Sequence, residues 1–147
     1  MGAGTCSFNT KSGAWSKAGQ WALTFRDCAV YDPEHILWFG FSASDGQLCA
    51  TDMTLTTTTP DLEQVWEDDL PPLEAWIPTG EHILPLGSGK FCVGRLFQRL
   101  KRRNLKIESI ALLVGVELVK DAGRGSLDMI KHKCKRYFFK DDEVKLL

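Results

Sequence analysis

Apolar and polar residues alternate in short stretches along most of the chain. The segments TCSFNT, QLCATD, KFCVGRLF and HKCKRYFF show this pattern around four of the cysteines. Alternation with a period of two residues is typical of a half-buried β-strand, and no long segment shows the 3.6-residue period of a helix. The pattern predicts strands near 4–9, 13–18, 27–31, 36–42, 47–53, 63–67, 81–86, 90–98, 107–119, 126–132 and 134–140.

Glycine-containing turns separate these stretches. Asp45-Gly46 and the segments 87–89 and 123–125 are predicted hairpin turns. The segments 56–60 and 68–72 are predicted to be an exposed loop and a connection between sheets, because adjacent prolines do not fit a central strand.

The alternation is clearest near the C-terminus, where residues 129–136 read MIKHKCKR. The lysines at 131, 133 and 135 are predicted to lie on one face of a strand, and the residues between them on the other. A turn near Lys133 would restrict this parity to each side of the turn.

The cysteine spacing indicates an internal repeat. The steps between Cys6, Cys49, Cys92 and Cys134 are 43, 43 and 42 residues. The tetrapeptide EHIL occurs at 34–37 and again 47 residues later. A period of roughly 40–50 residues is typical of propeller blades, which are four-stranded sheets.

The predicted fold is therefore all-β, with antiparallel four-stranded sheets forming an incomplete β-propeller of about two to three blades. A length of 147 residues suits a single domain. Within it we expect a partial blade at 1–26, a blade at 27–70, and a blade plus final strands at 71–147. Closed propellers need roughly four blades. An open arc, a ring completed by another copy and a truncated gene product are the alternatives, and open sheet edges would allow self-association.

Two segments resemble kelch blades. TCSFNTKSGAWSKAG is similar to the second half of a blade, in which a strand and a turn precede the Trp of the outer strand. LWFGFSASDGQLCATDM, followed by VWEDD, resembles the kelch order of strand, glycine, loop, strand, Asp and Trp, with Phe39-Gly40 in place of the kelch double glycine. Nearly the whole chain resembles uncharacterised plant proteins with kelch-like or F-box-associated propellers. The resemblance implies the fold, and substrate recognition for a ubiquitin ligase without the helical F-box.

Charge divides the chain into halves of opposite sign. Residues 1–88 contain 3 Lys and Arg against 12 Asp and Glu, a balance of −9, whereas residues 89–147 contain 15 against 7, a balance of +8. We expect the halves to pair with each other, and binding of an acidic partner by the basic half is the alternative. The longest apolar run, residues 110–116, is too short to cross a membrane. Without a secretory signal, a cytoplasmic or nuclear location with reduced thiols is expected.

No motif predicts catalysis, a cofactor or a metal site. The 5 cysteines include no C-x-x-C pair, and the 3 histidines have no zinc-ligand spacing. His35 and His82 are expected at strand entries with satisfied hydrogen bonds. The GSGK segment at 87–90 lacks P-loop spacing and is predicted to be a hairpin turn. Four cysteines are expected to be small buried residues: Cys28, Cys49, Cys92 and Cys134.

Two features are candidate protein-binding elements. The first is a basic run predicted to lie in an exposed loop between two long strands, consisting of Arg99, Lys101, Arg102 and Arg103. Nucleic acid is not favoured as its ligand, because no aromatic platform accompanies it. The second is Trp76, a loop aromatic that could be a contact residue or core filler.

The predicted function is a non-enzymatic protein-interaction module with an unidentified partner. A small-ligand or hydrolytic protein that uses Asp and His on blade loops is one alternative, and a truncated gene product without independent function is another.

Overall fold

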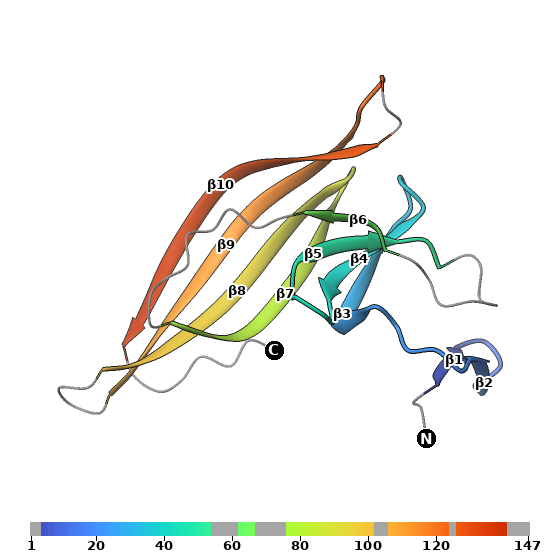
Figure 1. The fold of residues 1–147 in the computed structure, drawn as a ribbon, viewed down its shortest axis with the longest axis horizontal. Coiled ribbons are helices and arrows are strands. Elements are labelled where there is room, and N and C mark those ends of the chain that lie inside the picture. The colour runs from blue at the N-terminus through green and yellow to red at the C-terminus, as the bar shows by residue number, and fades with distance from the viewer. Residues whose placement is uncertain (1–3, 54–61, 67–75, 102–105, 124–125, 141–147) are drawn as a thin grey trace. The chain divides into compact units, whose positions relative to one another are not determined.

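The structure is a computed structural model that describes residues 4–53, 62–66, 76–101, 106–123 and 126–140. These residues form strands and turns and no helix, so none of them forms a helix that could cross a membrane. The chain divides into two compact units, Met1–Asp68 and Asp69–Leu147. The predicted all-β class with antiparallel four-stranded sheets is confirmed (Figure 1).

The first unit contains a hairpin and a four-stranded antiparallel sheet. Consecutive strands are neighbours in both, as in the up-and-down sheets of propeller blades. The hairpin pairs β1 (Thr5–Asn9) with β2 (Ala14–Gly19), and the sheet consists of β3 (Phe25–Asp32), β4 (Leu37–Ser42), β5 (Leu48–Thr51) and β6 (Leu62–Trp66).

The core of this unit centres on β4 and β5, where almost every residue is buried. The ring of Phe39 stacks on Trp66 with ring centroids 5.9 Å apart. Gly40 faces the ring of Phe25 so closely that a Cβ atom would lie 2.8 Å from a ring carbon. A side chain at this position would therefore displace Phe25, which explains why glycine follows Phe39.

The second unit is one antiparallel sheet of long strands with the order β10-β9-β8-β7. The pairing of β8 with β9 is unbroken from Lys90↔Glu117 to Lys101↔Lys106. The strands are β7 (Ile77–Gly87), β8 (Lys90–Lys101), β9 (Lys106–Lys120) and β10 (Leu127–Lys140).

Two of the three predicted hairpin turns are confirmed. Ser88 and Gly89 both have left-handed backbone conformations, with φ values of 51° and 64°. Two such residues in succession form the tight turn whose twist matches paired strands, so the GSGK segment is the β7–β8 hairpin. In the β4–β5 turn, Gly46 has φ 72° and its N–H donates to the carbonyl of Ser42. The third predicted turn extends beyond the described residues, as do the segments 56–60 and 68–72.

The two faces of the second sheet differ in burial. Paired residues on neighbouring strands project to the same face, so the register assigns every side chain to one face. Most buried apolar residues lie on the core face, namely Ile83, Phe91, Val93, Ile110, Leu112, Val114, Val116, Leu118 and Leu127, although this face also carries the exposed Phe138. The opposite face, which we name the open face, carries the exposed apolar residues Ile77, Leu84, Leu100, Ile107, Ile130 and Tyr137.

The C-terminal alternation differs from the prediction. The strands expected at 126–132 and 134–140 form one strand, β10, with a register shift between Lys131 and Cys134. Lys131 pairs with Val116 on the core face, whereas Lys135 pairs with Leu113 on the open face. The prediction that the three lysines share a face was wrong, because a bulge inserts one extra residue and resets the alternation.

The EHIL repeat is not a structural repeat. Residues 34–36 of its first copy lie in the turn between β3 and β4 and Leu37 begins β4, whereas its second copy, 81–84, lies inside β7. Cys49 lies in the third strand of its sheet and Cys92 in the second strand of the other. Pro33 begins the turn in the first copy, so identical letters adopt different structures. The division into propeller blades at residues 26 and 70 stays a prediction.

Ile36 is a test of this turn, because it has φ 58° and its side chain is exposed. A β-branched residue is strained in this region, which Asn adopts more readily. We expect Ile36→Asn to raise the free energy of unfolding by about 1 kcal/mol, measured by urea denaturation. Ile77→Asn, at an exposed position in β7 without a left-handed backbone, is the control and should not stabilise. Equal effects of the two substitutions would contradict the assigned strain.

Candidate interaction surface

The structure brings together two of the predicted binding residues, Arg99 and Trp76. The pairing of Ile77 with Gln98 places Trp76, the preceding residue, beside Arg99. The Arg99 guanidinium carbon lies 4.6 Å from the centroid of the Trp76 ring. Such a cation–π contact contributes about 0.5–1 kcal/mol at an exposed site. The half-buried Trp76 is therefore a platform for arginine.

Glu108 fixes the other side of Arg99 and was missed by sequence reasoning. Arg99 and Glu108 are directly paired across β8 and β9. Arg99 Nε donates to Glu108 Oε2 at 2.8 Å, and Arg99 Nη2 lies 2.7 Å from the same oxygen. The guanidinium is thus held between a carboxylate and an indole ring. Its positive charge is paired with Glu108 inside the sheet.

The rest of the basic run is placed differently from the prediction. Lys101 lies at the end of β8 and pairs with Lys106, so Arg99 and Lys101 belong to a strand and not to the exposed loop expected for them. The prediction was wrong because the pairing of β8 with β9 continues beyond residue 98, where the predicted strand ended. Arg102 and Arg103 lie outside the described residues.

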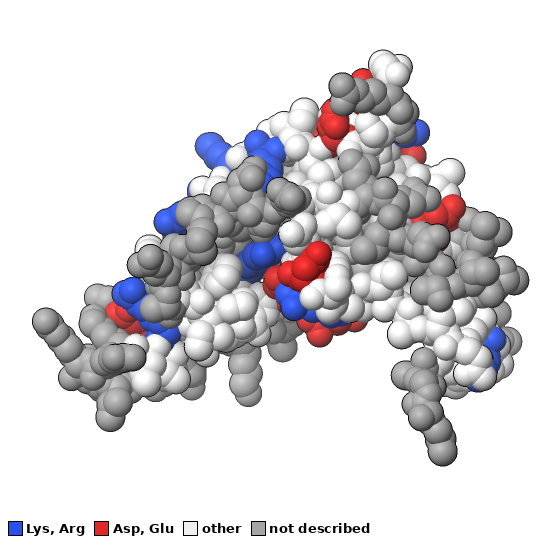
Figure 2. All heavy atoms as spheres, viewed as in Figure 1, with Lys and Arg blue, Asp and Glu red and all other residues white. Residues whose placement is uncertain are grey.

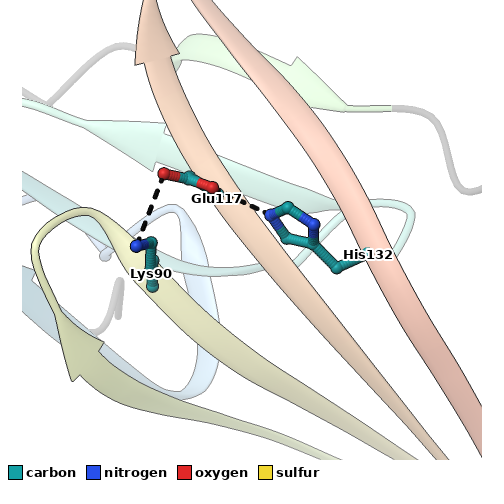
Figure 3. Close-up of polar contacts among 3 residues, drawn as sticks. All are labelled: Lys90, Glu117 and His132. Carbon is teal, nitrogen blue, oxygen red and sulfur yellow. Dashed lines mark hydrogen bonds and ion pairs between the residues drawn. The ribbon is translucent and has the colours of Figure 1, made fainter.

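A second polar cluster lies on the open face, at the end of the β8–β9 pair opposite to Arg99. Figure 3 shows its three side chains. Glu117 of β9 is positioned between Lys90 of β8 and His132 of β10. Its Oε1 lies 3.7 Å from Lys90 Nζ, and its Oε2 accepts a hydrogen bond of 2.8 Å from His132 Nε2. The bulge in β10 places His132 at this point, which the sequence pattern did not reveal.

The electrostatics of this cluster favour an ionised glutamate. The hydrogen bond from His132 lowers the pKa of Glu117 below its ordinary value, and the charge of Lys90 contributes in the same direction. All three side chains are partly exposed. The cluster is therefore a carboxylate held by a lysine and a histidine at the surface of the sheet.

A third ion pair lies on the core face. Glu81 of β7 and Arg95 of β8 are cross-strand neighbours, with Arg95 Nη1 3.7 Å from Glu81 Oε1. Both side chains are largely buried. A buried charge needs a partner of opposite charge. We therefore interpret this pair as a structural contact between β7 and β8.

The candidate histidines have different surroundings. His35 donates from Nδ1 to Asp32 Oδ2 at 2.5 Å inside the β3–β4 turn, which confirms the hydrogen-bonded strand entry expected for it. The side chains of His35 and Asp32 are only 5% and 6% exposed, so a substrate does not reach them. His82 lies in the middle of β7 with an exposed side chain, which does not match a strand entry. The two histidines are therefore not equivalent.

The cysteines are buried less often than predicted. Cys49 is fully buried, and burial raises the pKa of its thiol to about 11, so it is an inert thiol. Cys92 is half-buried, whereas Cys28 and Cys134 are exposed. The prediction was wrong for these two because both lie on outer strands of their sheets, beside register shifts.

Comparisons with known proteins give one result. A family model described as a protein of unknown function (DUF1668) matches residues 1–137. No curated protein and no solved structure matches the chain.

The Glu117 cluster makes a prediction about pH. A carboxylate with a lowered pKa stabilises the fold above its unfolded value of 4.5 and loses this contribution as the pH falls through the folded value. We expect His132→Ala to raise the pKa of Glu117 toward 4.5, and Lys90→Ala to raise it less, because the histidine hydrogen bond is the largest cause. A carbon-detected NMR titration measures both.

The control is Lys120→Ala, which removes an exposed lysine of the same strand as Glu117. It should leave the titration unchanged. A larger effect from Lys90→Ala than from His132→Ala would contradict the assigned cause.

Proposed function

The chain belongs to the DUF1668 family, whose function is unknown, and on this premise we propose that it is a non-enzymatic protein-interaction module. The observation that carries the proposal is the open face of the second sheet. Leu84 and Leu100 on this face are 60% and 57% exposed. The register places them with four further exposed apolar residues on one side of the sheet.

Exposed apolar residues indicate a protein-binding surface when several of them lie on the same face of a sheet. Single apolar residues are common on protein surfaces, whereas several on one sheet face are typical of an interaction site. The side chains project from paired strands, so little conformational entropy is lost when a partner covers them. A covered Leu84 or Tyr137 would contribute apolar area at the centre of an interface.

The charges beside this face indicate the chemistry of the partner. Glu117 is already matched by His132 and Lys90. Lys135 adds an exposed positive charge to the same face. The expected partner surface is therefore apolar and flanked by carboxylates.

The kelch-like resemblance suggests a more specific form of this function, substrate recognition for a ubiquitin ligase, in the cytoplasm or nucleus. The hydrolytic alternative on Asp and His of blade loops is less favoured, because Asp32 and His35 are buried against each other.

The proposal is tested by two threonine substitutions on the open face, Leu84→Thr and Ile107→Thr. Threonine retains the β-strand preference, and both positions are exposed, so folding should be unaffected. Each substitution should weaken partner binding roughly tenfold. The measurement is quantitative co-purification from extracts of the source organism, followed by titration of the recovered protein.

Trp15→Thr is the matched control, because Trp15 is an exposed aromatic of β2 in the other unit. A partner retained by the control and lost from both open-face variants supports the proposal. If every recovered protein binds all of the variants equally, the open face is not the binding surface.

A further inference from the structure

The second sheet has two outer strands that differ in chemistry. In the order β10-β9-β8-β7, β7 and β10 each have one strand neighbour among the described strands. Pro78 and Pro85 in β7 have no backbone N–H to donate, and the pairing of β7 with β8 shifts register beside each of them. β10 contains 14 residues and no proline. β10 is therefore the outer strand better suited to pair with another chain.

The register shows which backbone groups of β10 point outward. The N–H of Leu118 in β9 donates to the carbonyl of Gly89 at 2.8 Å, so the bonding groups of Leu118 point toward β8. In an antiparallel sheet this direction alternates along a strand. The backbone N–H and C=O groups of Val114 and Ile110 therefore also point toward β8. The pairing of β9 with β8 has no register shift between these residues.

The partners of these residues in β10 must direct their own backbone groups away from β9. They are Cys134, which pairs with Val114, and Phe138, which pairs with Ile110, with Arg136 between them. The side chains of all three are exposed. A continuous row of N–H and C=O groups therefore faces outward along the second half of β10.

This outward row is accompanied by positive charge. Lys133, Lys135 and Arg136 are exposed, and within the described part of the chain no carboxylate lies at ion-pair distance from them. Figure 2 shows Lys and Arg side chains gathered along the border where Figure 1 draws β10. The bulge sets Lys135 on the open face and Arg136 on the core face, so both sides of the strand are positive.

We propose that β10 binds an extended acidic peptide segment of a partner protein as an additional β-strand. The proposal rests on the protein-interaction function above and names the kind of partner and its mode of binding. Backbone hydrogen bonds would supply affinity, and opposite charges in cross-strand pairs would select acidic residues.

Charge decides between this occupant and a second copy of the chain. Pairing β10 with β10 would bring Lys133, Lys135 and Arg136 close to their own counterparts, and like charges directly opposite each other destabilise a sheet. Lysines on outer strands commonly prevent such self-pairing. The same lysines attract a strand of opposite charge.

The probe is a fluorescent peptide of about ten residues, a common strand length, in which Glu and Thr alternate. We expect it to bind the full chain with an affinity that falls as salt concentration rises. A peptide with Gln in place of Glu should bind at least roughly tenfold more weakly. Fluorescence anisotropy measures both.

Two substitutions at one exposed position test the backbone requirement. Phe138→Pro removes an outward N–H that β9 does not use, whereas Phe138→Thr removes the aromatic ring and keeps the N–H. Proline is tolerated on outer strands where its missing donor would face solvent. Binding should be lost in Phe138→Pro and retained in Phe138→Thr, and Lys135→Gln should reduce only the binding of the Glu peptide.

Three outcomes would overturn the inference. Equal binding by Phe138→Pro and Phe138→Thr would mean that the peptide binds by charge alone. Self-association in analytical ultracentrifugation that Phe138→Pro abolishes would assign β10 to a second copy. Absence of peptide binding, with the open-face partner still captured, would overturn this inference and leave the proposed function intact.

Discussion

The unbroken register between β8 and β9 is the constraint on which the second unit depends. Because side chains alternate along a strand, a shift of one residue would move every side chain to the other face. The register that buries Phe91 against Val116 also places Arg99 opposite Glu108. It sets Lys90 opposite Glu117 as well, at the other end of the same strands. Core packing and both polar clusters thus have a single geometric origin.

The same register explains the apolar residues left on the open face. A sheet with one buried face usually carries polar residues on the other. Here Leu100 pairs with Ile107, and Tyr137 lies beside Ala111 on that face. The pairing that buries the core face also exposes these residues. A register shifted by one residue would bury them instead, but it would expose the larger apolar area of the core face. The apolar second face is the observation on which the proposed interaction function rests.

The strands could be predicted from the sequence because two-residue alternation reflects one-sided burial directly. All of the expected strands have a counterpart, and β8 and β9 differ mainly in length. The repeat could not be predicted from EHIL or cysteine spacing, because four letters do not determine conformation. After Pro33 the first three of these residues form a turn that contains the buried Asp32–His35 hydrogen bond, whereas after Gly80 all four continue a strand.

The candidate site could be predicted only in part, for a related reason. Composition singled out Arg99 and Trp76, but the role of Glu108 requires knowing which residue lies opposite on the next strand. A cross-strand search for Arg and Glu at matching distances from the 102–105 connection could have found it. The position of His132 beside Glu117 depends on a bulge, and no turn residue in the sequence marks that bulge.

The bulge links the chemistry of the open face to that of the outer strand. Without the extra residue, Lys131, Lys133 and Lys135 would lie on one face, as regular alternation requires. With it, Lys131 and Arg136 lie on the core face and Lys135 on the open face. A strand added beside β10 would then meet positive charge above and below its own backbone. An acidic segment could pair its carboxylates with these positive charges on either face of the sheet. The bulge would therefore allow a wider range of acidic sequences to bind, whereas positively charged strands would still be repelled.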